Sequence, residues 1–250
     1  MKTLKKSLTI LILIISILFI NGCTIIKGGD GEDKEIINTI AENGVMTANF
    51  SVISYNQLNV PTAIGSGVAY FKESYTDFSY YYVLTNNHVV HNLANFEVRD
   101  AYGEKYRAAV IAKDSAYDLA VLKFMSEKTY FVPSLLQTNV KENEKIICLG
   151  EPNGIQNTVT LGRVVEYTKV DVEGGSLSLD NGGSQVEFEV IKHDAPINGG
   201  SSGGVVLDYN FNIVAINFAA SRDKETGKFL ASYAVQSTKV IEFLLSKDLA

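Results

Sequence analysis

The most regular pattern in the chain is a series of short apolar runs, rich in Val, Ile, Tyr and Phe, which are separated by clusters of Gly, Asn, Asp and Ser. Runs of this length between turn residues predict β-strands. The expected strands are Gly67–Phe71, Tyr80–Thr85, Asn95–Arg99, Lys105–Ala112, Leu119–Phe124, Lys145–Leu149, Asn157–Tyr167, Gln185–Ile191, Gly204–Asp208 and Ile213–Phe218. Many short strands with little helix indicate an all-β barrel or sandwich.

Two segments show helical spacing instead. Isoleucines recur at helical intervals over Glu35–Glu42 and predict a short helix there. A second helix is expected over Thr238–Ser246, with Ser237 as its N-cap. Its buried stripe should consist of Val240, Ile241, Leu244 and Leu245.

The N-terminal segment has the pattern of an export signal. Three lysines precede an apolar run from Leu8 to Ile20, which is too short for a comfortable membrane span. Residues 1–22 are therefore interpreted as a signal peptide. The run ends in Ile20-Asn21-Gly22-Cys23, which resembles the lipobox of bacterial lipoproteins. The resemblance implies diacylation of Cys23 (palmitate is the typical acyl group) and an extracytoplasmic protein anchored to the cell membrane. An ordinary signal peptide or an uncleaved anchor is the alternative.

Composition narrows the partners of the remaining chain. Residues 23–34 are rich in glycine and charge, as expected of a flexible tether. Without residues 1–22 the chain keeps 19 basic and 28 acidic residues and shows no basic stripe, which argues against nucleic acid as a partner. With Cys23 acylated, Cys148 stands alone in an apolar run and is expected to be a buried, inert thiol.

Only His88, His91 and His193 are available as a general base near neutral pH. His88 follows directly after the expected strand Tyr80–Thr85, so a rigid element would hold it while it faces a cleft. His91 is expected in a solvent-facing loop. His193 lies closer to the glycine-rich loop and is the rival candidate, although a lone histidine is more often structural.

Asp118 immediately precedes an apolar strand, so its carboxylate should be partly buried. A buried carboxylate is costly unless a cation or strong donors meet it, and the imidazolium of His88 is the natural partner. Taken alone, Asp118 would be a turn residue.

The segment 198–204 has the sequence NGGSSGG, which by itself is typical of a flexible connector. A serine nucleophile, however, needs an adjacent base, an orienting acid and N–H donors for the developing oxyanion. Glycines allow backbone N–H groups to point inward where side chains would clash. With His88 and Asp118 elsewhere in the chain, Ser202 becomes the candidate nucleophile.

The order His88, Asp118, Ser202 is that of chymotrypsin-type peptidases. The blocks LTNNHVV, DLAVLKF and DAPINGGSSGG resemble the histidine, aspartate and serine blocks of trypsin-like peptidases of the Deg/HtrA type. The segments GSG (65–67), VTLGRVV (159–165) and NIVAIN (212–217) are similar to the framework of that family. The resemblance runs from about residue 51 to about residue 243.

This resemblance implies an all-β fold of two perpendicular six-stranded β-barrels and a C-terminal helix, over residues 35–250 and divided near 128–131. It implies that Ser202 is the nucleophile, His88 the general acid/base and Asp118 the orienting carboxylate. The backbone N–H groups of Gly200 and Ser202 would form the oxyanion hole. No metal or organic cofactor is implied, the substrates would be proteins or peptides, and we expect no PDZ domain in this chain.

The glycine-rich loop departs from the family pattern. Gly199 stands where proline is usual and Ser201 where Asn or Asp is usual, which favours a more flexible loop. Pro196 occupies the position that is acidic in trypsins. The substrate pocket is expected to be formed by Pro196, Ile197, Ala215, Ile216 and Phe218, and to accept small or medium aliphatic residues.

Two functions follow from these patterns. The first is a membrane-tethered serine endopeptidase that works through an acyl-enzyme intermediate. The second is a non-catalytic, protease-like surface protein that uses the same scaffold for binding, because a fold alone does not determine activity. The intact set of His88, Asp118 and Ser202 favours the first, and the altered loop keeps the second open.

Overall fold

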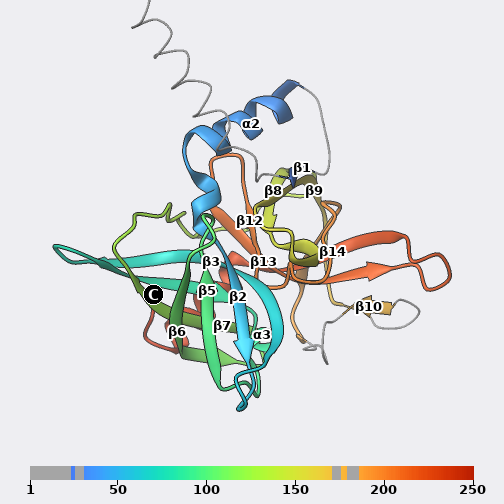
Figure 1. The fold of residues 1–250 in the computed structure, drawn as a ribbon. Coiled ribbons are helices and arrows are strands. Elements are labelled where there is room, and N and C mark those ends of the chain that lie inside the picture. Colours follow the sequence, from blue (N-terminus) through green and yellow to red (C-terminus); the bar gives the residue numbers. More distant parts are fainter. Residues whose placement is uncertain (1–23, 26–30, 171–175, 179–185) are drawn as a thin grey trace, which may run out of the picture.

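Two antiparallel barrels, each closed by six strands, make up most of the chain (Figure 1). The computed structural model describes residues 24–25, 31–170, 176–178 and 186–250. Barrel 1 has the strand order β2-β3-β4-β7-β6-β5 and barrel 2 the order β8-β9-β11-β14-β13-β12, with β8 and β9 closing it. The expected two-barrel fold is confirmed.

The bounds of most strands follow the predicted runs with a few extensions, whereas the strand predicted over 185–191 is wrong in its start, since β11 begins only at Val190. Barrel 1 is formed by β2 (Asn49–Tyr55), β3 (Pro61–Ser74), β4 (Ser79–Thr85), β5 (Asn95–Arg99), β6 (Lys105–Asp114) and β7 (Leu119–Ser126). Barrel 2 is formed by β8 (Lys145–Gly150), β9 (Thr158–Thr168), β11 (Val190–His193), β12 (Val205–Leu207), β13 (Ile213–Arg222) and β14 (Phe229–Gln236). The short strands β1 (Thr24–Ile25) and β10 (Ser176–Ser178) pair with β9 and β13.

Strands that are apolar on both faces explain how the barrels pack together. Successive side chains of a strand point to opposite faces. In β8, Ile146 and Cys148 belong to the core inside barrel 2, whereas Ile147 and Leu149 belong to a core shared with residues of barrel 1 such as Leu84. The apolar side chains on one face of β8 therefore fill barrel 2, and those on the other face pack against barrel 1.

Aromatic side chains fill the interior of barrel 1. The ring centroids of Phe50 and Phe124 lie 5.1 Å apart, and those of Phe50 and Tyr130 lie 5.0 Å apart, both in edge-on arrangements. Tyr81 stacks on Phe124 with 5.6 Å between centroids. Such pairs add about 0.5–1.5 kcal/mol each beyond the area that they bury.

The N-terminal helix is longer than expected. The helix α2 (Gly31–Glu42) begins four residues before the predicted start, because Glu32 and Asp33 occupy its first turn, where negative charge is favourable, and both contact Lys145 of β8. Together with β1, it places part of the expected tether 23–34 against barrel 2. The expected signal peptide and Cys23 lie outside the described residues.

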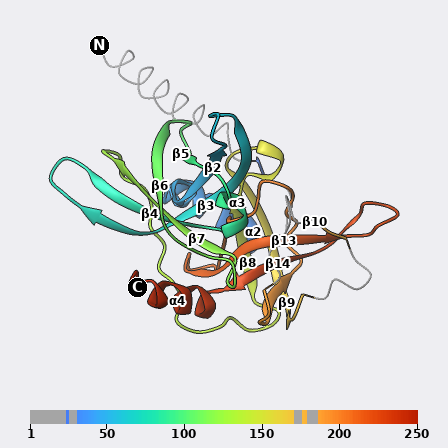
Figure 2. The same ribbon diagram turned by 90° about the horizontal axis from the view of Figure 1, so that it is seen from below.

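The C-terminal helix α4 (Ser237–Ser246) corrects two details of the prediction. Gln236, not Ser237, occupies the N-cap position, since Ser237 is already helical. Val240, Phe243 and Leu244 are buried, while Leu245 is 62% exposed. The helix packs beside β13 and β14 (Figure 2), and Lys247 just beyond it pairs with Asp114 of barrel 1 at 2.9 Å.

Sequence patterns missed β2 and β14 altogether. β2 is buried over almost its whole length despite Ser51 and Ser54, and β14 contains small and polar residues within the apolar run. In the loop expected over Gly174–Ser184, residues 176–178 form β10, and the others lie outside the described residues. Among the described residues, no helix has the length and apolar character needed to cross a bilayer.

Candidate active site

His88 and Asp118 form a buried, doubly hydrogen-bonded pair in barrel 1. His88 lies in the short helix α3 (Asn87–Val90) that follows β4, and Asp118 lies directly before β7. The ring atom Nδ1 of His88 is 2.7 Å from Oδ2 of Asp118, and the backbone N–H of His88 donates to Oδ1 at 3.0 Å. The side chains are 6% and 0% exposed. One carboxylate therefore orients both the ring and the backbone of the histidine.

The backbone around Asp118 is held just as firmly. Asp118 has a φ of 50°, in the left-handed region that few residues other than Gly, Asn and Asp enter. Its carbonyl oxygen accepts two hydrogen bonds, from the side chain of Asn86 at 2.9 Å and from the backbone N–H of Asn87 at 3.1 Å. These contacts tie the turn before β7 to the residues that lead into α3.

The serine loop is a tight turn followed by a contact with barrel 1. The N–H of Ser201 donates to the carbonyl of Asn198 at 2.9 Å, and Gly200 has a φ of 92°, as the third residue of a type II turn requires. The carbonyl of Ser202 accepts a hydrogen bond from the N–H of Ser66 at 2.7 Å. The departures at Gly199 and Ser201 are thus accommodated within a turn of defined geometry.

Glycine is required at position 203 of this loop. Gly203 has a φ of 83°, and a Cβ atom there would lie 2.1 Å from the carbonyl oxygen of Ser66 and 2.3 Å from Oγ1 of Thr85. Its N–H donates to the carbonyl of Asn217 at 2.8 Å. The loop is therefore clamped between β3, the end of β4 and β13.

The loop presents backbone donors that the fold itself does not use. Within the described part of the chain, the N–H groups of Gly200 and Ser202 donate to no hydrogen bond. The carbonyl of Gly199 accepts a hydrogen bond from the N–H of Asn153 at 2.6 Å. Because a trans peptide directs its C=O and N–H groups to opposite sides, the N–H of Gly200 points away from Asn153.

The loop approaches the segment that carries His88 from the other barrel. A Cβ atom built on Gly65 would lie 2.8 Å from the side chain of Val89 and 2.9 Å from the carbonyl oxygen of Ser202. Gly65 therefore separates the residue after His88 from the candidate nucleophile. The described residues offer no hydrogen-bond partner to Nε2 of His88, which is buried, and no bond joins it to the Ser202 hydroxyl.

The pocket beside Ser202 differs from the predicted one. It is lined by Ile197, Asn198, Gly199, Ser202, Ala219, Ala220 and Arg222. Of the predicted pocket residues only Ile197 lines it. Pro196 lines a neighbouring hollow behind the loop, while Ala215, Ile216 and Phe218 are at most 1% exposed and pack in the cores. One wall of this pocket is formed by Ala219, Ala220 and Arg222. These residues lie in the part of β13 beyond its predicted end at Phe218.

The remaining titratable candidates are His193, Cys148 and His91. His193 is fully buried, with Nε2 2.8 Å from Oδ1 of Asn217, and burial lowers the pKa of His193 to about 4. Burial raises the pKa of the Cys148 thiol to about 12, so it is not a nucleophile near neutral pH. His91 is exposed. No group of His, Cys, Asp and Glu side chains suited to a metal ion occurs among the residues described.

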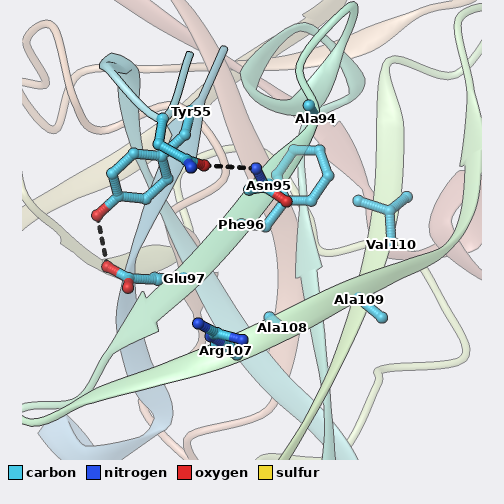
Figure 3. A pocket seen from close by; sticks show the side chains of 10 residues that line it. Tyr55, Ala94, Asn95, Phe96, Glu97, Arg107, Ala108, Ala109 and Val110 are labelled. Atoms are coloured by element: carbon cyan, nitrogen blue, oxygen red, sulfur yellow. Dashed lines mark hydrogen bonds between the residues drawn. The ribbon is translucent and has the colours of Figure 1, made fainter. Parts of the chain in front are cut away.

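A separate hollow on barrel 1 lacks these reactive groups (Figure 3). It is lined by residues of β2, β5 and β6 and their connections, including Tyr55, Phe96, Glu97 and Arg107, and its lining includes no serine, cysteine or histidine. The hydrogen bond to Glu97 is the main reason why the pKa of Tyr55 is raised to about 12. The pair formed by His88 and Asp118, with the loop around Ser202, therefore remains the candidate active site.

Comparison with known proteins agrees with the geometry. The model of the trypsin-like peptidase domain family matches residues 65–216. The chain is 29% identical to the serine protease HTRA1 of Xenopus laevis, which it matches over 84% of its own length and 42% of the relative's. It is 32% identical to the serine protease Do-like HtrA of Bacillus subtilis, over 73% of this chain and 39% of the relative. The chain thus spans about two fifths of the length of these relatives.

The solved structure of an HtrA-type protease with a tripeptide has the same fold. Its TM-score is 0.65 at 23% sequence identity, and the match covers 86% of this chain and 63% of that one. The two-barrel fold is therefore shared with this HtrA-type protease. This chain belongs to the trypsin-like peptidase domain family and is similar to the HtrA serine proteases.

Sequence reasoning did not assign the residues that support the loop. Ser66 appears only as part of the GSG segment and Arg99 only as the end of an expected strand, and Glu151 is assigned no role. The signal at Glu151 is a carboxylate that directly follows the apolar β8. The partners of such a residue, however, come from another barrel and cannot be found by spacing along the chain.

Proposed function

We propose that this protein is a serine endopeptidase that cleaves proteins or peptides through an acyl-enzyme intermediate. His88 takes the proton of the Ser202 hydroxyl as Ser202 attacks the scissile carbonyl, and later gives a proton to the leaving amine. Asp118 holds the imidazole in the tautomer that leaves Nε2 free to accept that proton. The N–H groups of Gly200 and Ser202 stabilise the oxyanion.

One observation supports this function above the others. The buried pair of His88 and Asp118 leaves Nε2 of His88 without a partner among the described residues, beside a loop whose N–H groups at 200 and 202 are equally unused. Buried polar groups in proteins are normally hydrogen-bonded. Unused donors and an unused acceptor on facing segments are what a substrate carbonyl and a serine hydroxyl would satisfy.

The test uses the neighbouring serine as a matched control. The full chain should hydrolyse casein and become labelled by a fluorophosphonate probe, and Ser202→Ala should abolish both. Ser201→Ala should remain labelled, because Ser201 Oγ only accepts a weak hydrogen bond of 3.4 Å from the N–H of Asn198. A wild-type protein that takes no label would instead favour the non-catalytic binding protein.

We further propose that the residue before the scissile bond is small and aliphatic. The pocket walls are provided by Ile197, Ala219 and Ala220, and the Arg222 guanidinium at its side is held by the carbonyl of Ile197 at 3.2 Å and by the side chain of Asn198. A basic side chain would meet the charge of Arg222. Profiling with a peptide library should give Ala or Val as the preferred residue, and a preference for Lys or Arg would contradict the proposal.

Export and anchoring are proposed from residues 1–23. The lysines, the apolar run and the lipobox-like Ile20-Asn21-Gly22-Cys23 support a lipoprotein signal and a lipid on Cys23. In a bacterial host fed a labelled fatty acid, the wild-type protein should carry the label in the membrane fraction. The Cys23→Ser variant should lose it. Equal incorporation by both proteins would exclude acylation at Cys23.

A further inference from the structure

We propose that Glu151 is a positioning residue that holds the oxyanion-binding loop in place by anchoring the segment 151–153 to barrel 1. The inference rests on the proposed function, since it assigns a role to a residue that touches neither substrate nor nucleophile. It starts from a carboxylate that is buried at the junction of the two barrels and has no part in the pair formed by His88 and Asp118.

The side chain of Glu151 crosses from barrel 2 to barrel 1. It is 1% exposed, and its oxygens contact the guanidinium of Arg99 on β5 and the hydroxyl of Ser51 on β2. Ser51 also accepts hydrogen bonds from Nε of Arg99 at 3.2 Å and from Nε2 of Gln156 at 3.1 Å. Arg99 is the only charged side chain that the described residues bring within ion-pair distance of Glu151.

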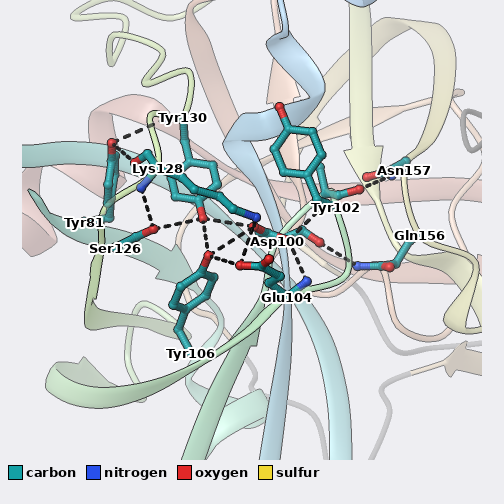
Figure 4. A network of polar contacts seen from close by, with 11 residues as sticks. Tyr81, Asp100, Tyr102, Glu104, Tyr106, Ser126, Lys128, Tyr130, Gln156 and Asn157 are labelled. Carbon is teal, nitrogen blue, oxygen red and sulfur yellow. Dashed lines mark hydrogen bonds and ion pairs between the residues drawn. The ribbon is translucent and has the colours of Figure 1, made fainter. Parts of the chain in front are cut away.

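Further contacts of barrel 2 strengthen this junction (Figure 4). The side chain of Gln156 donates to the carbonyl of Asp100 at 3.2 Å, and that of Asn157 donates to the carbonyl of Ala101 at 3.0 Å. The carboxylate of Asp100 is fixed in turn, accepting the N–H of Glu104 at 2.8 Å and the hydroxyl of Tyr130 at 3.0 Å. The platform that receives Glu151 is therefore rigid.

The backbone of the same segment holds the two peptide groups on either side of Gly200. The N–H of Asn153 donates to the carbonyl of Gly199, at 2.6 Å. The N–H of Glu151 donates to the hydroxyl of Ser66 at 2.9 Å, and that hydroxyl donates to the carbonyl of Gly200 at 2.8 Å. Fixing the carbonyl of Gly199 fixes the direction of the Gly200 N–H, the proposed oxyanion donor.

The two peptides are also in tight contact with the anchored segment. A Cβ atom on Gly200 would lie 2.4 Å from the carbonyl oxygen of Glu151. A displacement of the segment 151–153 would therefore move the loop with it. Catalytic donors must be placed to within a fraction of an ångström, and a shift of 1 Å can cost about 100-fold in rate.

The ionised carboxylate is the form that pairs with Arg99, so protonation should loosen the anchor. Burial raises the pKa of Glu151 to about 7, and the charge of Arg99 offsets only part of this rise. Loss of the proton from Glu151 should then contribute to the acid limb of kcat/KM, near pH 7. Protonation of Glu151 should lower kcat/KM to about the level of a variant with a neutral amide at this position.

The test compares the full-length wild type with Glu151→Gln, an isosteric amide that cannot ionise. We expect kcat/KM at pH 8 to fall about tenfold or more through kcat, with KM changed less than twofold and the fluorophosphonate labelling rate falling in parallel. The ratio of wild-type to variant kcat/KM should fall towards 1 as the pH is lowered below about 7. Arg99→Lys should retain more activity than Arg99→Met. Glu73→Gln is the control, since Glu73 pairs with Lys123 at 3.1 Å on the same barrel, away from the loop.

Stability and hydrogen exchange separate positioning from folding. Glu151→Gln should keep the Tm of the wild type at pH 8, while exchange of the Asn153 and Ser201 amides accelerates. Unchanged kinetics and amide exchange in the variant would overturn the proposal, as would an activity loss that merely follows a loss of Tm. The exchange measurement does not depend on activity. A wild type that takes no fluorophosphonate would therefore refute the proposed function and leave this test decisive.

Discussion

The two barrels hold their parts of the candidate active site in different ways. Barrel 1 holds His88 and Asp118 by direct contacts within one structural unit, and the two side chains are nearly inaccessible. Barrel 2 provides Ser202 on a loop whose geometry depends on hydrogen bonds to Ser66 of the other barrel. The proposed base is thus built into one barrel, whereas the proposed nucleophile is positioned by the packing of both.

The largest effect should come from the self-contained half of the site. Asp118→Asn keeps the shape of the side chain but favours the wrong tautomer of His88. In the general template for such triads this substitution lowers kcat by about 10⁴-fold. Steady-state kinetics should show this loss with little change in Tm. A loss below about tenfold would mean that Asp118 does not orient the base.

The loop should fail for a steric reason when Gly203 is replaced. Gly203→Ala places a Cβ atom 2.1 Å from the carbonyl oxygen of Ser66. It also requires a residue with a side chain to adopt a φ of 83°. We expect activity to fall by about 100-fold or more, together with a loss of stability of about 2 kcal/mol. Gly31→Ala is the control, because nothing lies within 4 Å of its built Cβ. Equal effects of both variants would contradict the assigned clamp.

A smaller effect is expected at the hydroxyl that joins the barrels. Ser66→Ala removes the bridge between the N–H of Glu151 and the carbonyl of Gly200, while the backbone bond from Ser66 to Ser202 remains. A lost hydrogen bond of about 1–1.5 kcal/mol corresponds to about a tenfold lower kcat/KM. Ser54→Ala is the comparison, because the hydroxyl of Ser54 makes no hydrogen bond with the described residues. Equal kcat/KM values for the two variants would show that the Ser66 hydroxyl does not contribute to activity.

The mildest test is the stability of barrel 2 against pH. His193 is buried as the neutral ring, and its pKa of about 4 lies below the unfolded value of 6.5. The unfolded chain then binds the proton more readily, so stability should fall as pH drops from about 6.5 to about 4. Chemical denaturation at several pH values should show a weaker decline for His193→Gln. Parallel curves would indicate that His193 does not contribute to the decline.

Local patterns were sufficient for the framework of the fold, and they also suggested the residues of the proposed triad. The apolar runs located most strands, and His88 and Asp118 could be selected because each stands directly beside a strand end. The pocket could not be predicted from the same patterns. Ala215 and Ile216 belong to cores on either side of β13, while the strand runs on to Arg222, beyond its predicted end.

The exposed face of α4 and the contacts between the barrels could not be predicted, for related reasons. Leu245 follows the helical spacing but faces solvent, because the position of the sheet, not the helix, decides which residues are covered. The position of Glu151 after an apolar strand is a signal of burial, but its partners Ser51 and Arg99 could not be found because they lie on strands far away along the chain. Tertiary packing, which periodicity does not encode, decides both.

The hydrogen bond from the amide of Ser66 to the carbonyl of Ser202 joins main chain to main chain. Ordinary side-chain replacement cannot delete it, and proline at position 66 is the only natural residue that lacks the donor. The registration of the two halves is therefore robust to most point mutations. It is sensitive to changes in length, because one residue inserted into β3 before Ser66 would move the Ser66 amide away from the carbonyl of Ser202.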